Sequence, residues 1–224
     1  MRLYKPFLSI GLLALCGLTA PLAFADEIEY AITVDTSSQL ANMGWIEFQF
    51  NGSPSGSQPA DAEISNFATD GTIIPPPQLT GDASGALPGT VSMDNGTNFD
   101  DYFEALTFGN TVTFDLTLSG PAIGATANGE GGGTFTLDFL DSTQSNYLFT
   151  ADPINDVPVF TVDVNPDGSV TPTAYGSVDT AEAPGSVVSF SQVPEPSMAL
   201  LLAGGLAGMA ILRRRRRARI FKGE

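Results

Sequence analysis

Short stretches in which apolar and polar residues alternate recur through the middle of the chain. The alternation covers residues 28–34, 45–50, 111–118, 134–139 and 160–164. In residues 111–118, for example, Val112, Phe114, Leu116 and Leu118 alternate with threonines and an aspartate. A period of two is typical of a β-strand with one buried and one solvated face. The pattern therefore predicts at least five such strands.

Turn-forming sequences separate these stretches, among them Asn51-Gly52, Asp70-Gly71 and Asn165-Pro166-Asp167-Gly168. No stretch between residues 26 and 193 has a helical period. We therefore expect an all-β fold, an antiparallel, jelly-roll-like β-sandwich over residues 26–178. Residues 51–62 and 75–90, rich in Pro, Gly and Ser, are expected to be loops. Residues 179–192 are expected to be a stalk, with room for one late strand at 187–190.

The first 25 residues have the order of an export signal. A basic start with Arg2 and Lys5 is followed by an apolar run from Phe7 to Leu22, and then by Ala23-Phe24-Ala25. This order predicts a Sec signal peptide cleaved after Ala25, within a small-x-small site formed by Ala23 and Ala25.

The C-terminus combines three features in a fixed order. Val193-Pro194-Glu195-Pro196 leads into an uncharged run over residues 198–212, and five arginines follow, namely Arg213, Arg214, Arg215, Arg216 and Arg217. As a helix, residues 197–212 would span about 24 Å, which is close to the thickness of a bilayer core. The arginines would stop transfer and hold residues 218–224 in the cytoplasm, so that everything before Pro194 lies outside.

Residues 193–217 resemble the PEP-CTERM sorting signal. The resemblance implies that an exosortase, a membrane cysteine transpeptidase, cuts the chain near Pro194-Glu195-Pro196. An ordinary single-span anchor that is never processed is the alternative. The ectodomain also resembles a group of uncharacterised PEP-CTERM proteins, through stretches such as Phe48-Gln49-Phe50 and Gly81-Asp82-Ala83-Ser84-Gly85. That group carries no known activity.

Charge is distributed very unevenly along the chain. All nine Lys and Arg residues lie in the two ends, there is no His, and the single Cys lies in the signal peptide. All but two of the 25 acidic residues lie between them, so residues 26–193 carry carboxylates without any cation. Nucleic-acid binding, zinc sites with N or S ligands, and Ser-His or Cys-His catalysis are thereby excluded. We expect no enzymatic activity, and Ca²⁺ is the natural counterion for such a domain.

Two acidic segments are candidate Ca²⁺ sites. Asp163, Asn165 and Asp167 have the spacing of a calcium loop, although Ala174 stands where an EF-hand would place Glu. A type I hairpin turn explains the same residues. In residues 94–101, Asp94, Asp100 and Asp101 could bind Ca²⁺ together with carbonyl oxygens, or could be an acidic surface loop.

Trp45, the single tryptophan, falls on the outward phase of its stretch. It could stack on a sugar ring, or it could cover the sheet.

These observations predict a structural or adhesive protein of the cell surface or extracellular matrix. It would be exported by the Sec translocon, held in the inner membrane as a precursor by its C-terminal helix, and processed by an exosortase. The alternative is a surface module that binds Ca²⁺ or polysaccharide. No cofactor is expected other than Ca²⁺.

Overall fold

The computed structural model describes residues 27–52, 56–97, 99–124, 127–128, 130–150, 158–175, 187–194, 204–205 and 208–209. Twelve strands and one 3-10 turn are assigned in these residues. They are β1 (Glu27–Asp35), η1 (Ser37–Gln39), β2 (Met43–Asn51), β3 (Asp61–Thr69), β4 (Thr72–Thr80), β5 (Ser84–Gly85), β6 (Val91–Asp94), β7 (Asp101–Thr107), β8 (Thr111–Ser119), β9 (Gly133–Asp141), β10 (Phe160–Val164), β11 (Val170–Ala174) and β12 (Val188–Val193).

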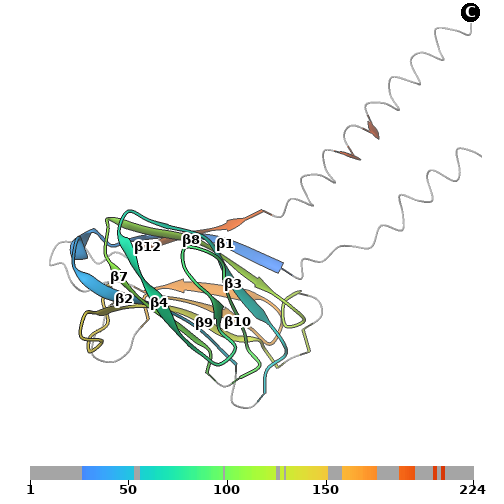
Figure 1. The fold of residues 1–224 in the computed structure, drawn as a ribbon. Coiled ribbons are helices and arrows are strands. Elements are labelled where there is room, and N and C mark those ends of the chain that lie inside the picture. Colours follow the sequence, from blue (N-terminus) through green and yellow to red (C-terminus); the bar gives the residue numbers. More distant parts are fainter. Residues whose placement is uncertain are drawn as a thin grey trace, which may run out of the picture.

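The strands form two antiparallel six-stranded sheets (Figure 1). One sheet has the order β12-β1-β8-β3-β6-β5 and the other has the order β11-β10-β9-β2-β7-β4. The pairs β1–β8, β2–β7 and β3–β6 are nested in sequence and alternate between the two sheets, as in a jelly roll. The prediction of an all-β fold with antiparallel sheets is confirmed.

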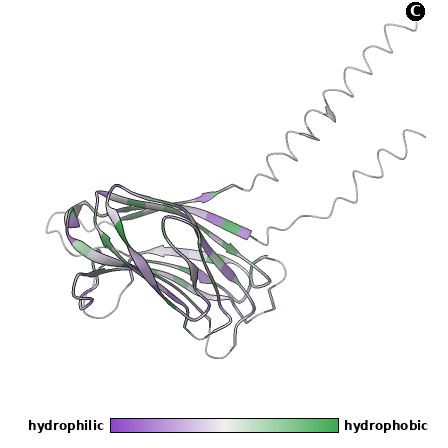
Figure 2. Ribbon diagram, in the orientation of Figure 1, coloured by the Kyte–Doolittle hydropathy of each residue, from purple (hydrophilic) through white to green (hydrophobic). Residues whose placement is uncertain are grey.

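A single hydrophobic core fills the space between the sheets. Phe48 of β2 packs edge-to-face against Phe114 of β8 in the opposite sheet, with ring centroids 5.2 Å apart. Both rings are almost completely buried. Figure 2 shows hydrophobic and hydrophilic residues alternating along the strands, which is why the core-facing side of each sheet is apolar.

The five strands predicted from alternation are all present, as β1, β2, β8, β9 and β10. Each keeps its alternation because it carries no bulge of its own; the register shift between β3 and β8 comes from an extra residue in β3. The turn at residues 165–168 is also present, since the Gly168 N–H donates to the Asn165 carbonyl at 2.9 Å.

The expectation of a loop over residues 75–90 is wrong in part, because β4 continues to Thr80 and β5 follows. Three prolines, 75–77, fall within β4, at the point where its pairing with β7 shifts register. β4 is the edge strand of its sheet. Proline has no N–H to donate, and edges and bulges are the places where a sheet tolerates that loss.

Two further strands were not visible in the alternation. In β3, a register shift around Asn66 moves the buried positions from Ala62 and Ile64 to Phe67. In β7, a charged residue, Glu104, occupies a buried inward position. The register shift in β3 and the buried Glu104 in β7 each interrupt the alternation of apolar and polar residues on which the prediction depended.

The predicted stalk over residues 179–192 also needs correction. β12 occupies residues 188–193 and pairs with β1 along its whole length, so the chain is part of the sandwich up to Val193. Residues 176–186 lie outside the described residues. The late strand allowed at 187–190 is present and longer than expected.

Candidate functional site

Three aspartates from separate segments converge at one end of the sandwich. Asp82 follows β4, Asp94 ends β6, and Asp100 directly precedes β7. One carboxylate oxygen from each lies within 4.8 Å of those of the other two. Within the described part of the chain, no other three acidic, Cys or His side chains come together so closely. We refer to Asp82, Asp94 and Asp100 as the aspartate cluster.

Asp100 is the buried member of the cluster, with no exposed surface. Its Oδ1 accepts hydrogen bonds from the Asp82 N–H at 2.5 Å and from the Thr97 hydroxyl at 2.7 Å. Its own N–H donates to Asn51 Oδ1 at 3.0 Å. Its Oδ2, in contrast, is buried and has no hydrogen-bond partner among the described residues. Such an orphaned carboxylate oxygen is costly unless a ligand satisfies it.

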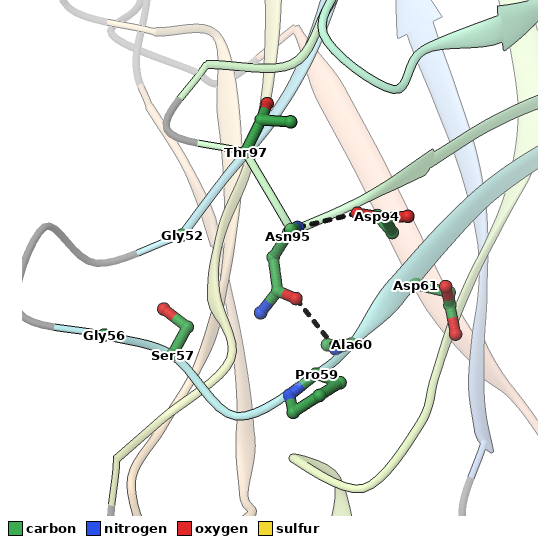
Figure 3. A pocket seen from close by; sticks show the side chains of 10 residues that line it. Gly52, Gly56, Ser57, Pro59, Ala60, Asp61, Asp94, Asn95 and Thr97 are labelled. Carbon is green, nitrogen blue, oxygen red and sulfur yellow. Dashed lines mark hydrogen bonds between the residues drawn. The ribbon is translucent and has the colours of Figure 1, made fainter.

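Asn95 holds the end of β6 in place beside the cluster. Its Oδ1 accepts from the Ala60 N–H at 3.0 Å, and its Nδ2 donates to the carbonyls of Gln58 and Gly132 at 2.8 and 2.7 Å. Next to it, Asp94 Oδ1 accepts from the Gly96 N–H at 2.6 Å. Figure 3 shows the Asn95 side chain turned toward Ala60. Both residues line a cavity of about 490 Å³, together with Asp61 and Asp94.

A second cavity, of about 480 Å³, adjoins the cluster on the outer face of the β1-β8-β3-β6 sheet. Its lining includes Glu27, Asp61, Glu63, Asp82 and Asp94. The charge of Asp94 is the main cause that raises the pKa of Asp82, and burial raises the pKa of Asp61 with Asp94 adding to the effect. The shift of Asp82 reports unneutralised negative charge at this end of the molecule, whereas that of Asp61 arises mainly from burial.

Asp101, predicted to share a site with Asp94 and Asp100, lies outside the aspartate cluster. It is the first residue of β7 and lies opposite Gln49 of β2, where it hydrogen-bonds with Glu47. Burial raises the pKa of Asp101 to about 7, and the charge of Glu47 adds to the effect. Successive residues of a strand point to opposite faces, so Asp100 and Asp101 diverge.

Asp163, Asn165 and Asp167 lie at the hairpin between β10 and β11. Asp163 accepts from the Thr134 hydroxyl at 2.6 Å, and Asp167 Oδ1 accepts from the N–H and hydroxyl of Ser169 at 3.0 and 2.6 Å. Asn165 Nδ2 donates to Thr171 Oγ1 at 2.8 Å. The bonds of Asn165 and Asp167 are those of a polar hairpin turn, whereas that of Asp163 joins β10 to β9 across the sheet.

Trp45 is half-buried on the outer face of its sheet, as its phase predicts. Its indole stacks on the ring of Phe103, with centroids 4.6 Å apart and planes inclined by 4°. Phe103 already covers one face of the indole, so Trp45 acts as a cover for the sheet.

At the end of β12, Val193 is half-buried and Pro194 is exposed. The remaining predicted sorting and signal residues, Glu195, Pro196, Arg213–Arg217, Ala23 and Ala25, lie outside the described residues. Residues 204–205 and 208–209 are helical. In the described part of the chain, no helix has the length and apolar character needed to cross a bilayer.

Residues 192–217 match the family model of the PEP-CTERM protein-sorting motif. The chain carries a PEP-CTERM motif. The match begins at Gln192, inside β12, so this PEP-CTERM sequence starts on the last two residues of the sheet. No curated protein and no solved structure matches the chain.

Sequence reasoning missed Asp82 as a member of the cluster. Asp82 lies 18 residues before Asp100, and the stretch between them was expected to be largely loop. The one available signal was Gly81-Asp82, since a glycine next to a carboxylate is typical of a tight turn.

Proposed function

We propose that this protein is a structural or adhesive component of the cell surface or extracellular matrix. The PEP-CTERM motif supports an exosortase-sorted surface protein whose precursor is exported and anchored in the membrane. This single match carries the proposal.

The sandwich has a core built from apolar side chains of both sheets. Its strand-rich surface carries acidic and hydroxyl side chains and, between residues 26 and 193, no cation. We propose that the ectodomain is not an enzyme, since the same stretch contains no His, Cys, Lys or Arg.

The sorting mechanism is part of the proposal. The Sec translocon would export the chain, signal peptidase would cut after Ala25, and the C-terminal segment would hold the precursor in the inner membrane. An exosortase would then cut near Pro194-Glu195-Pro196. Because β12 ends at Val193, cleavage there would leave the whole sandwich intact and release it to the cell surface or the medium.

The intact mass and both termini of the protein recovered from its producing cells test this proposal. An N-terminus at Asp26 and a C-terminus between Pro194 and Pro196 are expected, and replacement of Pro194, Glu195 and Pro196 by alanine should retain the full tail. Replacement of Ser189 and Ser191 by alanine, just upstream of the matched motif, should leave processing unchanged. A wild-type chain that still ends at Glu224 would overturn exosortase processing.

The adhesive role has a separate test. Cells that lack the protein should attach less well to surfaces or to one another, and the wild-type chain should restore attachment. A chain with the alanine replacements at Pro194, Glu195 and Pro196 should fail to restore it. Unchanged attachment in cells that lack the protein would exclude this role.

A surface module that binds Ca²⁺ or polysaccharide is the second candidate function. The polysaccharide interpretation relied on Trp45, whose indole is stacked on the ring of Phe103. The Ca²⁺ interpretation is favoured by the aspartate cluster.

A further inference from the structure

The geometry points to a Ca²⁺ site formed by Asp82, Asp94 and Asp100. This inference goes beyond the leading proposed function, because export, sorting and adhesion do not require a metal, and it specifies the site of the Ca²⁺-binding alternative. It differs from the sequence prediction in one member, since Asp82 takes the place of Asp101.

The spacing of the three carboxylates fits a single Ca²⁺ ion. Oxygens that bind one Ca²⁺ at about 2.3–2.6 Å can lie at most about 5 Å apart. One oxygen each from Asp82, Asp94 and Asp100 lies within 4.8 Å of the other two.

The orphaned oxygen of Asp100 is an independent sign of a ligand. Asp100 has no exposed surface, and no group among the described residues donates a hydrogen bond to its Oδ2. Its Oδ1 is held by two donors, so the carboxylate cannot rotate Oδ2 toward a partner without losing them. A cation bound to Oδ2 would compensate the buried charge.

The backbone around the cluster has the close approach that a cation site requires. Gly81 has φ of +66°, and a Cβ at this position would lie 1.9 Å from Asp100 Oδ1 and 2.5 Å from the Phe99 carbonyl oxygen. Only glycine fits this backbone without steric conflict. The Phe99 carbonyl and the Thr97 hydroxyl bring further oxygens to the same place.

The ligand set favours Ca²⁺ over other metals. All the atoms are oxygens, from carboxylates, a carbonyl and a hydroxyl, which is the set that Ca²⁺ prefers. Zn²⁺ sites normally contain N or S ligands, and residues 26–193 contain neither His nor Cys. Mg²⁺ keeps several of its waters and requires near-octahedral geometry, so three carboxylates from separate loops suit it less.

A bound ion would also relieve the repulsion among the neighbouring carboxylates. The cavity beside the cluster adds Glu27, Asp61 and Glu63 to the local negative charge. Since residues 26–193 contain no Lys or Arg, the neutralising cation has to come from solution. The ion would tie together the segment after β4, the end of β6 and the start of β7.

Calorimetric and thermal titrations of the full-length protein, purified in detergent and treated with EGTA, test this site. We expect one Ca²⁺ per chain, with a dissociation constant of about 0.1–1 mM, in the range of extracellular modules. At ten times that constant, the melting temperature should rise by about 3–6 °C. Mg²⁺ at the same concentration should give a clearly smaller rise.

Variants that each remove one negative charge distinguish Ca²⁺ binding at the cluster from a general screening of carboxylate repulsion. Asp82→Asn and Asp94→Asn, both on partly or fully exposed side chains, should lose the binding heat and the Ca²⁺-specific rise in melting temperature. Asp115→Asn and Asp163→Asn remove the same charge outside the cluster and should keep both. An equal response in all four variants, or equal shifts with Mg²⁺ and Ca²⁺ in the wild type, would overturn the site.

Discussion

Val193 of β12 lies directly opposite Glu29 of β1. The first strand of the ectodomain therefore begins beside the point at which the chain leaves for the sorting tail (Figure 1). Across the same sheet, Glu27 lies opposite Ser119, Ser119 opposite Asp61, and Asp61 opposite Asp94. In the proposed precursor, the end that carries the aspartate cluster would thus face the membrane.

The packing of Phe190 predicts how much β12 contributes to the stability of the sandwich. Phe190 of β12 packs against Tyr30 of β1 and Phe160 of β10, with ring centroids 6.2 and 5.3 Å apart. Phe190→Ala should lower the free energy of unfolding by about 1–2 kcal/mol, less than for a fully buried ring because Phe190 is 39% exposed. Denaturant titration measures the loss. Leu79→Ala, at a side chain that is 45% exposed, should change stability by less than about 0.5 kcal/mol.

Asn95 should contribute more to stability than its place in an acidic loop suggests. Asn95→Ala would leave the N–H of Ala60 and the carbonyls of Gln58 and Gly132 without their partner. We expect a loss of about 2–4 kcal/mol in denaturant titration. Asn42→Ala, which removes an exposed hydrogen bond to Gln39, is the control and should cost less than about 0.5 kcal/mol. Equal effects of the two variants would contradict the bridging role of Asn95.

The core contains a polar pair that also permits a test. The buried Tyr102 hydroxyl donates to Glu104 and accepts from the Leu87 N–H at 2.9 Å. Tyr102→Phe removes both bonds and should cost about 2–4 kcal/mol, measured by thermal and denaturant unfolding. Tyr30→Phe removes a hydroxyl from another core tyrosine and should cost under about 1 kcal/mol. A loss from Tyr102→Phe no larger than this control would show that the buried pair is not stabilising.

The pair of Glu47 and Asp101 predicts a pH dependence. Because folding raises the pKa of Asp101 to about 7, the folded state binds a proton more tightly than the unfolded state. Its stabilising contribution is complete below about pH 4 and is lost as the pH rises through about 7. After allowance for solvent screening of this partly exposed pair, we expect the loss to be about 1–2 kcal/mol.

Asp101→Asn should remove this pH dependence, so the variant should be more stable than wild type at pH 8 and similar at pH 4. Unfolding free energies measured across this range provide the test. Asp115→Asn, on the other sheet, removes the same charge and serves as the control for the general repulsion among carboxylates. If the unfolding free energy of the wild type had the same slope against pH as that of Asp101→Asn, the raised pKa of Asp101 would be contradicted.

The sequence alone determined the features that depend on local order along the chain. The PEP-CTERM motif was recognisable because its three parts are consecutive, and five strands were recognisable because they carry no bulge of their own and keep a period of two. The absence of Lys, Arg, His and Cys from residues 26–193 excluded whole classes of chemistry without any structure.

The tertiary structure decided which carboxylates share a site. Asp100 and Asp101 are neighbours in sequence, but Asp101 bonds with Glu47 of β2, whereas Asp100 accepts a hydrogen bond from Asp82, 18 residues away. Strands with prolines, a bulge or a buried Glu104 were likewise hidden, because pairing with a neighbouring strand overrides their weak local pattern. Convergence of side chains depends on strand pairing across the sheets, and no local period records that pairing.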